Sequence, residues 1–293
     1  MTIKGYIDYW NQWQAEWYRV AIENSSEEKT SNSITVEGWP LLGVNGSNNN
    51  SVKVQPSWKF FPEPYWGIPD SNNLNGVFIN FNPGEGQLAQ HINTAIEYSS
   101  IKKSNLNHRI WEKFPEQNYY ETIKKLYSED DYMTTNWMRK KRESFIHNYI
   151  NTFDKDKEHN GDFVMFELCP WHTKSVTNKV YKYIKDNLRL IDEYIIDFAI
   201  ESAKTVEGTF NNLILTHGLD KKIVENNINT LECFAKEEIN NDSLKKPWTI
   251  DVFTKAGSNV YLLNFKNSSN GFPVISTELK KIIVKYRGII EKN

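Results

Sequence analysis

The sequence predicts an α/β layered fold with a mainly parallel sheet of four strands. Two observations lead to this prediction. Four short apolar runs each end in a polar, proline or glycine turn, and longer stretches with helical spacing separate them. Strands that alternate with helices pair in parallel, because each helix carries the chain back across the sheet. The predicted strands are residues 76–81, 163–168, 212–216 and 259–265.

The first predicted helix covers residues 5–24. Apolar side chains recur there at spacings of three to five residues, which places them along one side of a helix. A row of exposed tryptophans could stack on nucleic-acid bases, but such a stripe is more often buried, and we expect a core stripe. Its members are Tyr6, Ile7, Trp10, Trp13, Trp17 and Ile22.

Further helices are predicted over residues 87–98, within 105–152, over 176–206 and over 276–290, whereas residues 25–75 show no clear pattern. Neither an internal repeat nor a linker divides the chain. We therefore expect a single domain of residues 1–293, in which residues 1–60 form an N-terminal helical elaboration and residues 60–293 form the α/β core.

Composition limits the class of protein. The 293 residues are 39% hydrophobic and 14% aromatic, which is typical of a globular chain. The net charge of −2 excludes a protein that coats nucleic acid through a large positive excess. The chain has no apolar run of roughly 18 residues, no apolar signal-peptide core at its start, and too few cysteines for a disulfide framework. We expect a cytoplasmic protein with no membrane contact and no obligate protein partner.

The ends of the predicted strands indicate where a ligand would bind. In open α/β sheets, ligands bind beyond the carboxyl ends of the strands. Each predicted strand here is followed by a segment that is polar or contains proline or glycine. These segments are residues 82–84, 167–171, 217–218 and 264–270, and together they form the predicted active-site pocket.

Several common catalytic motifs are absent or weak. Residues 84–89 match the loose dinucleotide pattern G-x-G-x-x-[GA], but no second strand ends in an acidic residue about 20 residues later. The chain has no P-loop, no spacing typical of zinc ligands and no serine nucleophile elbow. We therefore expect neither a metal nor a cofactor. A nucleotide-binding enzyme that uses Gly84 and Gly86 stays as an alternative.

Two motifs that follow the first two strands carry a resemblance to a known family. They are Asn80-Phe81-Asn82-Pro83-Gly84 and Glu167-Leu168-Cys169-Pro170. They resemble the uracil-DNA glycosylase superfamily, in the branch of the mismatch-specific and single-strand-selective enzymes. That branch carries Gly-hydrophobic-Asn-Pro-Gly, and its single-strand-selective members carry Asn-Tyr-Cys-Pro. Here Asn80 replaces the first glycine and Glu167 replaces the asparagine. The resemblance covers about residues 60–290 in element order and implies a three-layer α/β/α sandwich.

A third family motif, His-Pro-Ser, follows the last strand, and its serine-bearing backbone grips DNA phosphates. The corresponding segment here, residues 264–270, contains serines but neither histidine nor proline. Either Asn264 or Lys266 stands where the family has its histidine. This departure leaves the stabilisation of the leaving base open, so a catalytically inactive, DNA-binding relative stays as a second alternative.

The resemblance implies a DNA glycosylase that flips a nucleotide out of DNA and hydrolyses its N-glycosidic bond, as in base excision. Asn82 would hold the attacking water, although Asn82-Pro83-Gly84 is also a good turn sequence. The implied base-binding residues are Tyr65, Trp66, Phe81, Glu167 and Asn264, and the implied phosphate contacts are Lys174, Lys266, Ser268 and Ser269.

Glu167 predicts which base is read. An asparagine can both donate to uracil and accept from it, whereas a carboxylate only accepts. Facing cytosine, a carboxylate accepts from the N4 amino group. We therefore expect a modified base derived from cytosine, since attack on ordinary cytosine would destroy the host genome. Such an enzyme would serve in DNA repair or in defence against phage DNA with altered bases. A protonated Glu167, which could also donate, is the alternative.

Overall fold

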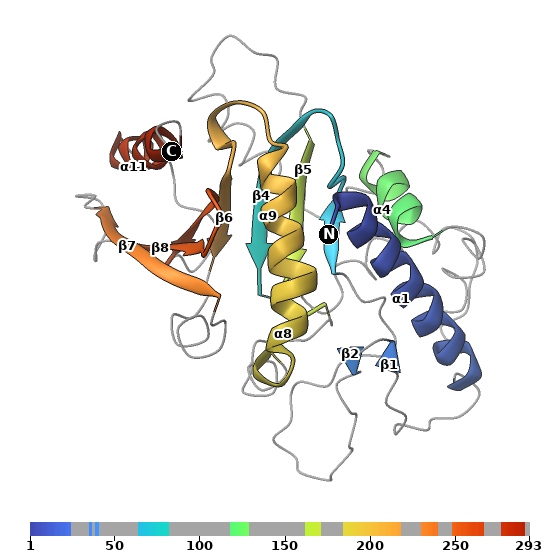
Figure 1. Cartoon of the computed structure of the whole chain (residues 1–293). Coiled ribbons are helices and arrows are strands. Elements are labelled where there is room, and N and C mark those ends of the chain that lie inside the picture. The colour runs from blue at the N-terminus through green and yellow to red at the C-terminus, as the bar shows by residue number, and fades with distance from the viewer. Residues whose placement is uncertain are drawn as a thin grey trace.

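The computed structural model describes residues 1–24, 35–36, 39–40, 64–81, 118–128, 162–170, 184–217, 230–239, 248–266 and 277–290. The main feature of these residues is a mixed sheet of seven strands in the order β3-β5-β4-β6-β9-β8-β7 (Figure 1). A separate two-stranded sheet pairs β1 (Thr35–Val36) with β2 (Trp39–Pro40). The strands of the main sheet are β3 (Tyr65–Gly67), β4 (Leu74–Asn80), β5 (Asp162–Glu167), β6 (Leu213–His217), β7 (Leu231–Ile239), β8 (Trp248–Lys255) and β9 (Tyr261–Phe265).

The four predicted strands are all present and correspond to β4, β5, β6 and β9. They are neighbours and run parallel in the order β5-β4-β6-β9. The predicted α/β class is therefore confirmed. The predicted mainly parallel sheet of four strands is wrong, because β3 extends the sheet beyond β5 and the pair β8 and β7 extends it beyond β9. All three added strands pair antiparallel, so the sheet is mixed.

The sequence pattern does not reveal the three additional strands, for physical reasons. β3 has only three residues. In β7 only the two end residues, Leu231 and Ile239, are buried, because this strand pairs with β8 alone and forms an edge of the sheet. Charged side chains are typical of such an edge, since they discourage pairing with other chains. The buried centre of β8 includes Asp251, which interrupts the apolar run.

The direction in which successive strands are added across the sheet reverses at β4. The chain passes from β4 to its neighbour β5 on one side and then crosses back to β6 on the other side. A sheet of this order has a crevice beyond the carboxyl ends of the two strands where the direction reverses, here β4 and β6. The sheet therefore places its most favourable ligand position next to Asn80 and His217, the last residues of these strands.

The described α-helices correspond to predicted helical regions, whereas the short 3₁₀ turn after residue 206 was not predicted. α1 (Ile3–Asn24) matches the predicted N-terminal helix, and α11 (Thr277–Ile290) matches the predicted C-terminal one. The predicted helix over 87–98 lies outside the described residues. The other described helices are α4 (Tyr119–Ser128), α8 (Leu188–Ile191), the π-helical turn η2 (Asp192–Ile196), α9 (Asp197–Lys204) and the short 3₁₀ turn η3 (Gly208–Phe210).

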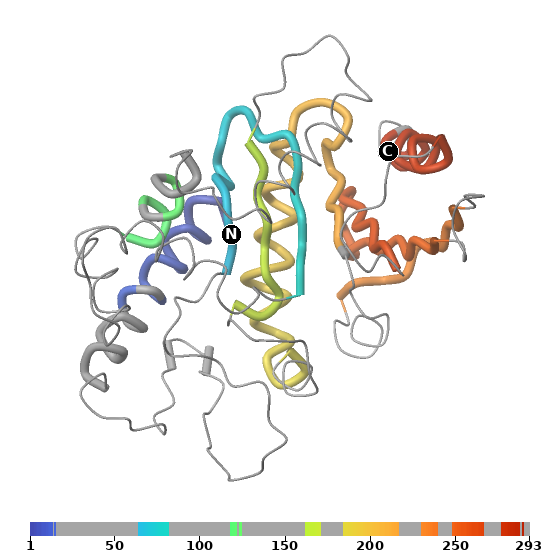
Figure 2. The backbone as a smooth tube through the Cα atoms, turned by 180° about the vertical axis from the view of Figure 1, so that it is seen from behind, coloured from blue at the N-terminus to red at the C-terminus, as the bar shows by residue number. Residues whose placement is uncertain are grey.

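α1 and α9 cover one face of the sheet. The ring centroid of Phe198 in α9 lies 4.8 Å from those of Phe166 in β5 and Tyr6 in α1. α9 lies in front of β4 and β5 in Figure 1 and behind them in the reversed view of Figure 2. The predicted core stripe of α1 is confirmed for the members whose side chains are described, which are the buried Tyr6, Ile7, Trp10 and Trp13.

α11 covers the opposite face. The strand register aligns Phe166, Ile79, Thr216 and Asn264 in one row, so these residues share the face that α9 covers. Tyr261 lies three positions before Asn264 and points to the other face, where its ring lies 5.4 Å from that of Tyr286 in α11. The described helices therefore flank the sheet on both faces.

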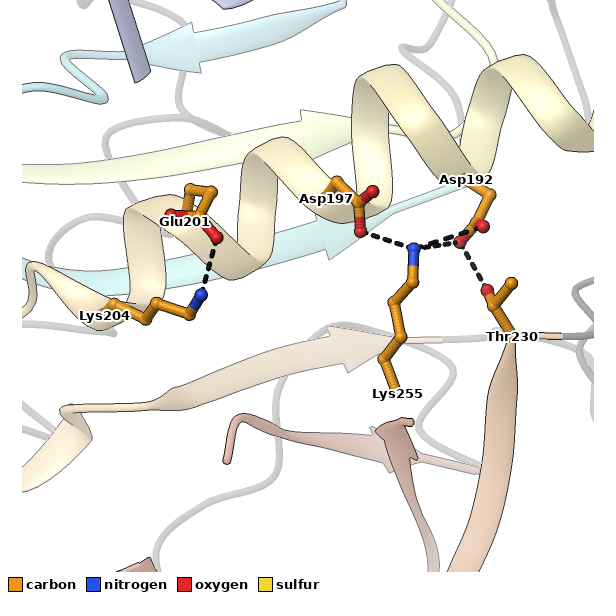
Figure 3. Close-up of polar contacts among 6 residues, drawn as sticks. All are labelled: Asp192, Asp197, Glu201, Lys204, Thr230 and Lys255. Atoms are coloured by element: carbon orange, nitrogen blue, oxygen red, sulfur yellow. Dashed lines mark hydrogen bonds and ion pairs between the residues drawn. The ribbon is translucent and has the colours of Figure 1, made fainter. Parts of the chain in front are cut away.

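A polar cluster joins the C-terminal strands to the helices around η2. Lys255 Nζ, at the end of β8, lies 2.5 Å from Asp197 Oδ1 and 3.2 Å from both carboxylate oxygens of Asp192 (Figure 3). Thr230, just before β7, donates a hydrogen bond of 2.6 Å to Asp192. The Lys255 and Asp192 side chains are 19% and 17% exposed, so solvent screens their attraction only in part.

Candidate functional site

The candidate site lies where β4 and β5 end. Asn80 and Glu167 are paired in register as the last residues of these two parallel strands. The pairing continues beyond the strands, because Leu168 N–H donates to Asn80 O over 3.1 Å and Cys169 N–H donates to Phe81 O over 2.9 Å. The segments that carry the two family-like motifs therefore leave the sheet side by side.

Asn80 and Glu167 also contact each other through their side chains. Asn80 Nδ2 donates a hydrogen bond of 3.2 Å to Glu167 Oε1. Asn80 is 8% exposed and Glu167 is 3% exposed, so Glu167 is not a solvated strand-end carboxylate. The backbone of Glu167 is held as well, because its N–H donates to Pro64 O over 3.0 Å. A buried carboxyl group thus sits in a defined orientation beside an amide donor.

This pair lies on the face of the sheet opposite to α9. Phe166 packs against Phe198 of α9, and Glu167 as the next residue of β5 points the other way. Three aromatic or apolar side chains share that face near the pair, because the register aligns Trp66, Met165 and Phe78 across β3, β5 and β4. These three side chains are buried, so the pair places a polar acceptor and donor at the carboxyl edge of an apolar layer.

Trp66 adds a second polar group to this face. It is 4% exposed, and its Nε1 is buried with no hydrogen-bond partner in the described part of the chain. A buried indole N–H normally has a partner. Trp66 therefore contributes both an aromatic ring and an available donor on the same face as Glu167. Phe81, the other aromatic candidate at this edge, is also buried.

Tyr65 occupies a different environment from the other predicted base-binding residues. Its register with Phe166 places it on the α9 face, where its ring contacts those of Tyr119, Phe166 and Phe198. Tyr119 OH donates to Tyr65 O over 2.5 Å. Burial raises the pKa of the Tyr65 hydroxyl well above its usual range, so the group stays neutral. This packing favours a core role for Tyr65 over stacking on a base.

A second polar row crosses the sheet on the α9 face. Thr216, Asn264 and Asp251 are in register across β6, β9 and β8, and all three are buried. Lys266 forms an ion pair with Asp251. The ammonium group of Lys266 is thus engaged by a buried carboxylate, which favours a structural role over phosphate binding. Asn264 and Glu167 lie on opposite faces, so the structure does not bring them together on one face of the sheet.

The sequence did not reveal every residue of the site, and several predicted site residues lie outside the described part of the chain. Asn80 is the main addition, and its signal was visible as an asparagine in place of the family glycine. Cys169 is a buried free cysteine, as expected for a core residue. Among the predicted site residues, Asn82, Lys174, Ser268 and Ser269 lie outside the described residues, as do Gly84 and Gly86 of the alternative nucleotide site.

The described residues also limit other kinds of site. In the ranges given above, no group of three or more His, Cys, Asp and Glu side chains is placed to hold a metal ion. No helix in the described part of the chain is long and apolar enough to span a bilayer.

Comparisons with known proteins do not assign the chain to a family. No protein-family model matches the sequence, and neither curated proteins nor solved structures give a significant match. A function for this chain must therefore be inferred from its own residues and from the two motifs at the ends of β4 and β5.

Proposed function

We propose that the chain is a DNA glycosylase that hydrolyses the N-glycosidic bond of a flipped, cytosine-derived base. One observation carries this proposal. The ends of β4 and β5 lie side by side with a buried Asn80–Glu167 hydrogen bond between them, directly before Asn82 and Cys169-Pro170. This juxtaposition supports the resemblance of the two motifs. They are far apart in the sequence, since the first ends at Gly84 and the second begins at Glu167, but the fold brings them together.

The chemistry needs few protein groups. The oxygen of a water molecule attacks the sugar C1′, and the bond from C1′ to the base nitrogen breaks. The base leaves with the electron pair and takes up the proton that the water loses. The transition state is cationic at the sugar, so positioned dipoles and charges stabilise it without a strong base. In this proposal Asn82 positions the water, Glu167 binds the polar edge of the base, and Trp66 or Phe81 stacks on its ring.

The topology supports a ligand beside Asn80, the last residue of β4. The strand order reverses between β4 and β6, and such a point in an open α/β sheet is the usual position of a ligand. The finer fold that we propose is the three-layer α/β/α sandwich of the uracil-DNA glycosylase superfamily, built on the four parallel strands. The proposed reaction requires no cofactor, and its role is DNA repair or defence against phage DNA with altered bases.

The proposed contacts to DNA phosphates are Lys174, Ser268 and Ser269. Phosphate contacts set the position of a protein on DNA without reading its sequence. Lys266 is a weaker candidate, because it forms an ion pair with the buried Asp251. Asn264 keeps its proposed part in binding the leaving base only if the base reaches the α9 face of the sheet.

An abasic-site assay tests the proposal. Oligonucleotides that contain uracil, cytosine, 5-hydroxymethylcytosine or its glucosylated form are incubated with the full chain and then cleaved with alkali. We expect breaks at a cytosine derivative, and a rate at least about 100-fold lower for Asn82→Ala, since a positioned polar group contributes about that much to such a step. Asn259→Ala, at an exposed asparagine before β9, is the matched control and should keep the wild-type rate.

Other results of these experiments would indicate a different function. DNA binding without strand breaks would indicate an inactive relative that keeps the fold. A rise in melting temperature with NAD or a nucleoside triphosphate, together with no effect of DNA, would indicate the nucleotide-binding enzyme. Breaks that persist in Asn82→Ala would remove Asn82 from the mechanism.

A further inference from the structure

We infer that Asn80 and Glu167 form one base-reading unit, in which Asn80 holds the Glu167 carboxylate as a hydrogen-bond acceptor for an exocyclic amino group. This inference rests on the proposed function and names its substrate class. Asn80 is a positioning residue here, because it acts through Glu167.

The first support is that two departures from the family motifs contact each other. Asn80 stands where the resembled family has glycine, and Glu167 stands where it has asparagine. The two positions are 87 residues apart, and the structure joins them by a hydrogen bond of 3.2 Å. A glycine at position 80 has no side chain that could reach residue 167. In this chain the amide donor and the carboxyl group that it contacts therefore occur together.

The second support is the orientation of the groups. The Asn80 amide points its Nδ2 donor at Glu167 Oε1, and both side chains are buried. A buried carboxylate keeps its charge more readily when it accepts hydrogen bonds, because the bonds replace part of its lost hydration. The amide thus donates to one carboxyl oxygen of Glu167 and restrains the rotation of the side chain.

A carboxylate at position 167 determines which edge of a base the site accepts. A carboxylate can pair with the N4 amino group of a cytosine derivative, but it repels the O4 carbonyl of the corresponding uracil derivative. A good contact to a base edge discriminates by roughly tenfold to 100-fold. We therefore expect this factor between two bases that differ only in an amino group against a carbonyl group.

The experiment compares DNA containing 5-hydroxymethylcytosine with DNA containing 5-hydroxymethyluracil, each with and without glucose on the hydroxymethyl group. Single-turnover rates of base release give an amino-to-carbonyl preference ratio for each glucosylation state. We expect this ratio to exceed about ten for the wild type and to fall by about tenfold to 100-fold in Glu167→Gln, which keeps the shape of the side chain but adds a donor. Thr216→Val, a buried change on the other face of the sheet, should leave the ratio unchanged.

Variants at position 80 separate positioning from packing. Asn80→Gly should lower the ratio by about threefold to tenfold, and Asn80→Ser, which keeps a short donor, should restore part of it. In the Glu167→Asn background, Asn80→Gly should change the ratio no further, because an effect transmitted through Glu167 disappears when Glu167 is absent. Thermal melting confirms that each variant is folded, and Asn80→Ser replaces Asn80→Gly if the glycine variant fails to fold.

The failure of this inference is distinct from failure of the proposed function. If the wild type releases bases but prefers the carbonyl form, or if Glu167→Gln leaves the ratio unchanged, Glu167 is not the base reader and the inference is wrong. If Asn80→Gly changes the ratio equally with and without Glu167, the pair does not act as a unit. If the wild type releases no base from any of the substrates, the proposed function itself fails.

Discussion

Buried polar side chains near the carboxyl edge of the sheet differ in what they contact. Glu167 accepts from Asn80, and Asp251 forms an ion pair with Lys266. Thr216 is equally buried, yet its hydroxyl has no hydrogen-bond partner in the described part of the chain. A buried hydroxyl without a partner costs free energy of folding, since it has given up its hydrogen bonds to water. At the scale of single residues, burial alone therefore does not show that a polar group stabilises the fold.

The variant Thr216→Val should raise the free energy of unfolding by about 1 kcal/mol, because valine has nearly the same shape and removes the unpaired hydroxyl. Urea denaturation measures this change. The control is Thr254→Val, since the hydroxyl of Thr254 donates to the carbonyl oxygens of Ser258 and Val260. That variant should lower the free energy of unfolding. A loss of stability in Thr216→Val as large as in the control would show that the Thr216 hydroxyl has a partner.

At the scale of elements, the π-helical turn η2 explains how one lysine contacts two aspartates. In an α-helix, residues five positions apart point about 140° away from each other. The backbone N–H of Asp197 bonds to Asp192 O, which is the wider i to i+5 pattern of a π-turn. This turn brings Asp192 and Asp197 to one side of the helix, where both contact Lys255 at the end of β8 (Figure 3). The irregular turn therefore connects the helical layer to strands far away in the sequence.

We expect Lys255→Met to lower the free energy of unfolding by about 1–3 kcal/mol, because it leaves two partly buried carboxylates without their cation. The value is below that of a fully buried pair, since the Asp197 side chain is 34% exposed. The control is Lys204→Met, which breaks the more exposed pair with Glu201 drawn in the same view. It should change stability by less than about 0.5 kcal/mol. Equal effects of the two variants in urea denaturation would show that the contacts of Lys255 with Asp192 and Asp197 stabilise the fold no more than an exposed ion pair does.

At the scale of the whole molecule, the net charge of −2 limits how the chain can bind DNA. Attraction to phosphates must come from a local group of basic residues rather than from an overall positive charge. We expect modest binding that involves about five phosphates, with a slope of roughly −4 to −5 in a plot of log affinity against log salt concentration. Fluorescence anisotropy with a labelled duplex measures this slope. A slope near zero would remove nucleic acid from the partners of this chain.

The positions of the four central strands were predictable because each is an apolar run that ends abruptly. Parallel strands in the middle of a sheet are buried on both faces, so their sequences carry a strong signal. β7 carries no such signal, since it lies at an edge and most of its side chains are exposed. For the same reason the number of strands in the sheet could not be predicted. The α1 stripe was predictable, because its apolar residues repeat at helical spacing.

The sequence by itself determined the α/β class, the four parallel strands and the two motifs that follow β4 and β5. These features are local, since each depends on a short run of neighbouring residues. Only the tertiary structure decided that Asn80 contacts Glu167, that Tyr65 packs in the core on the α9 face, and that Lys266 is bound to Asp251. Those outcomes depend on strand order and register, because a shift of one residue would turn each side chain to the other face of the sheet.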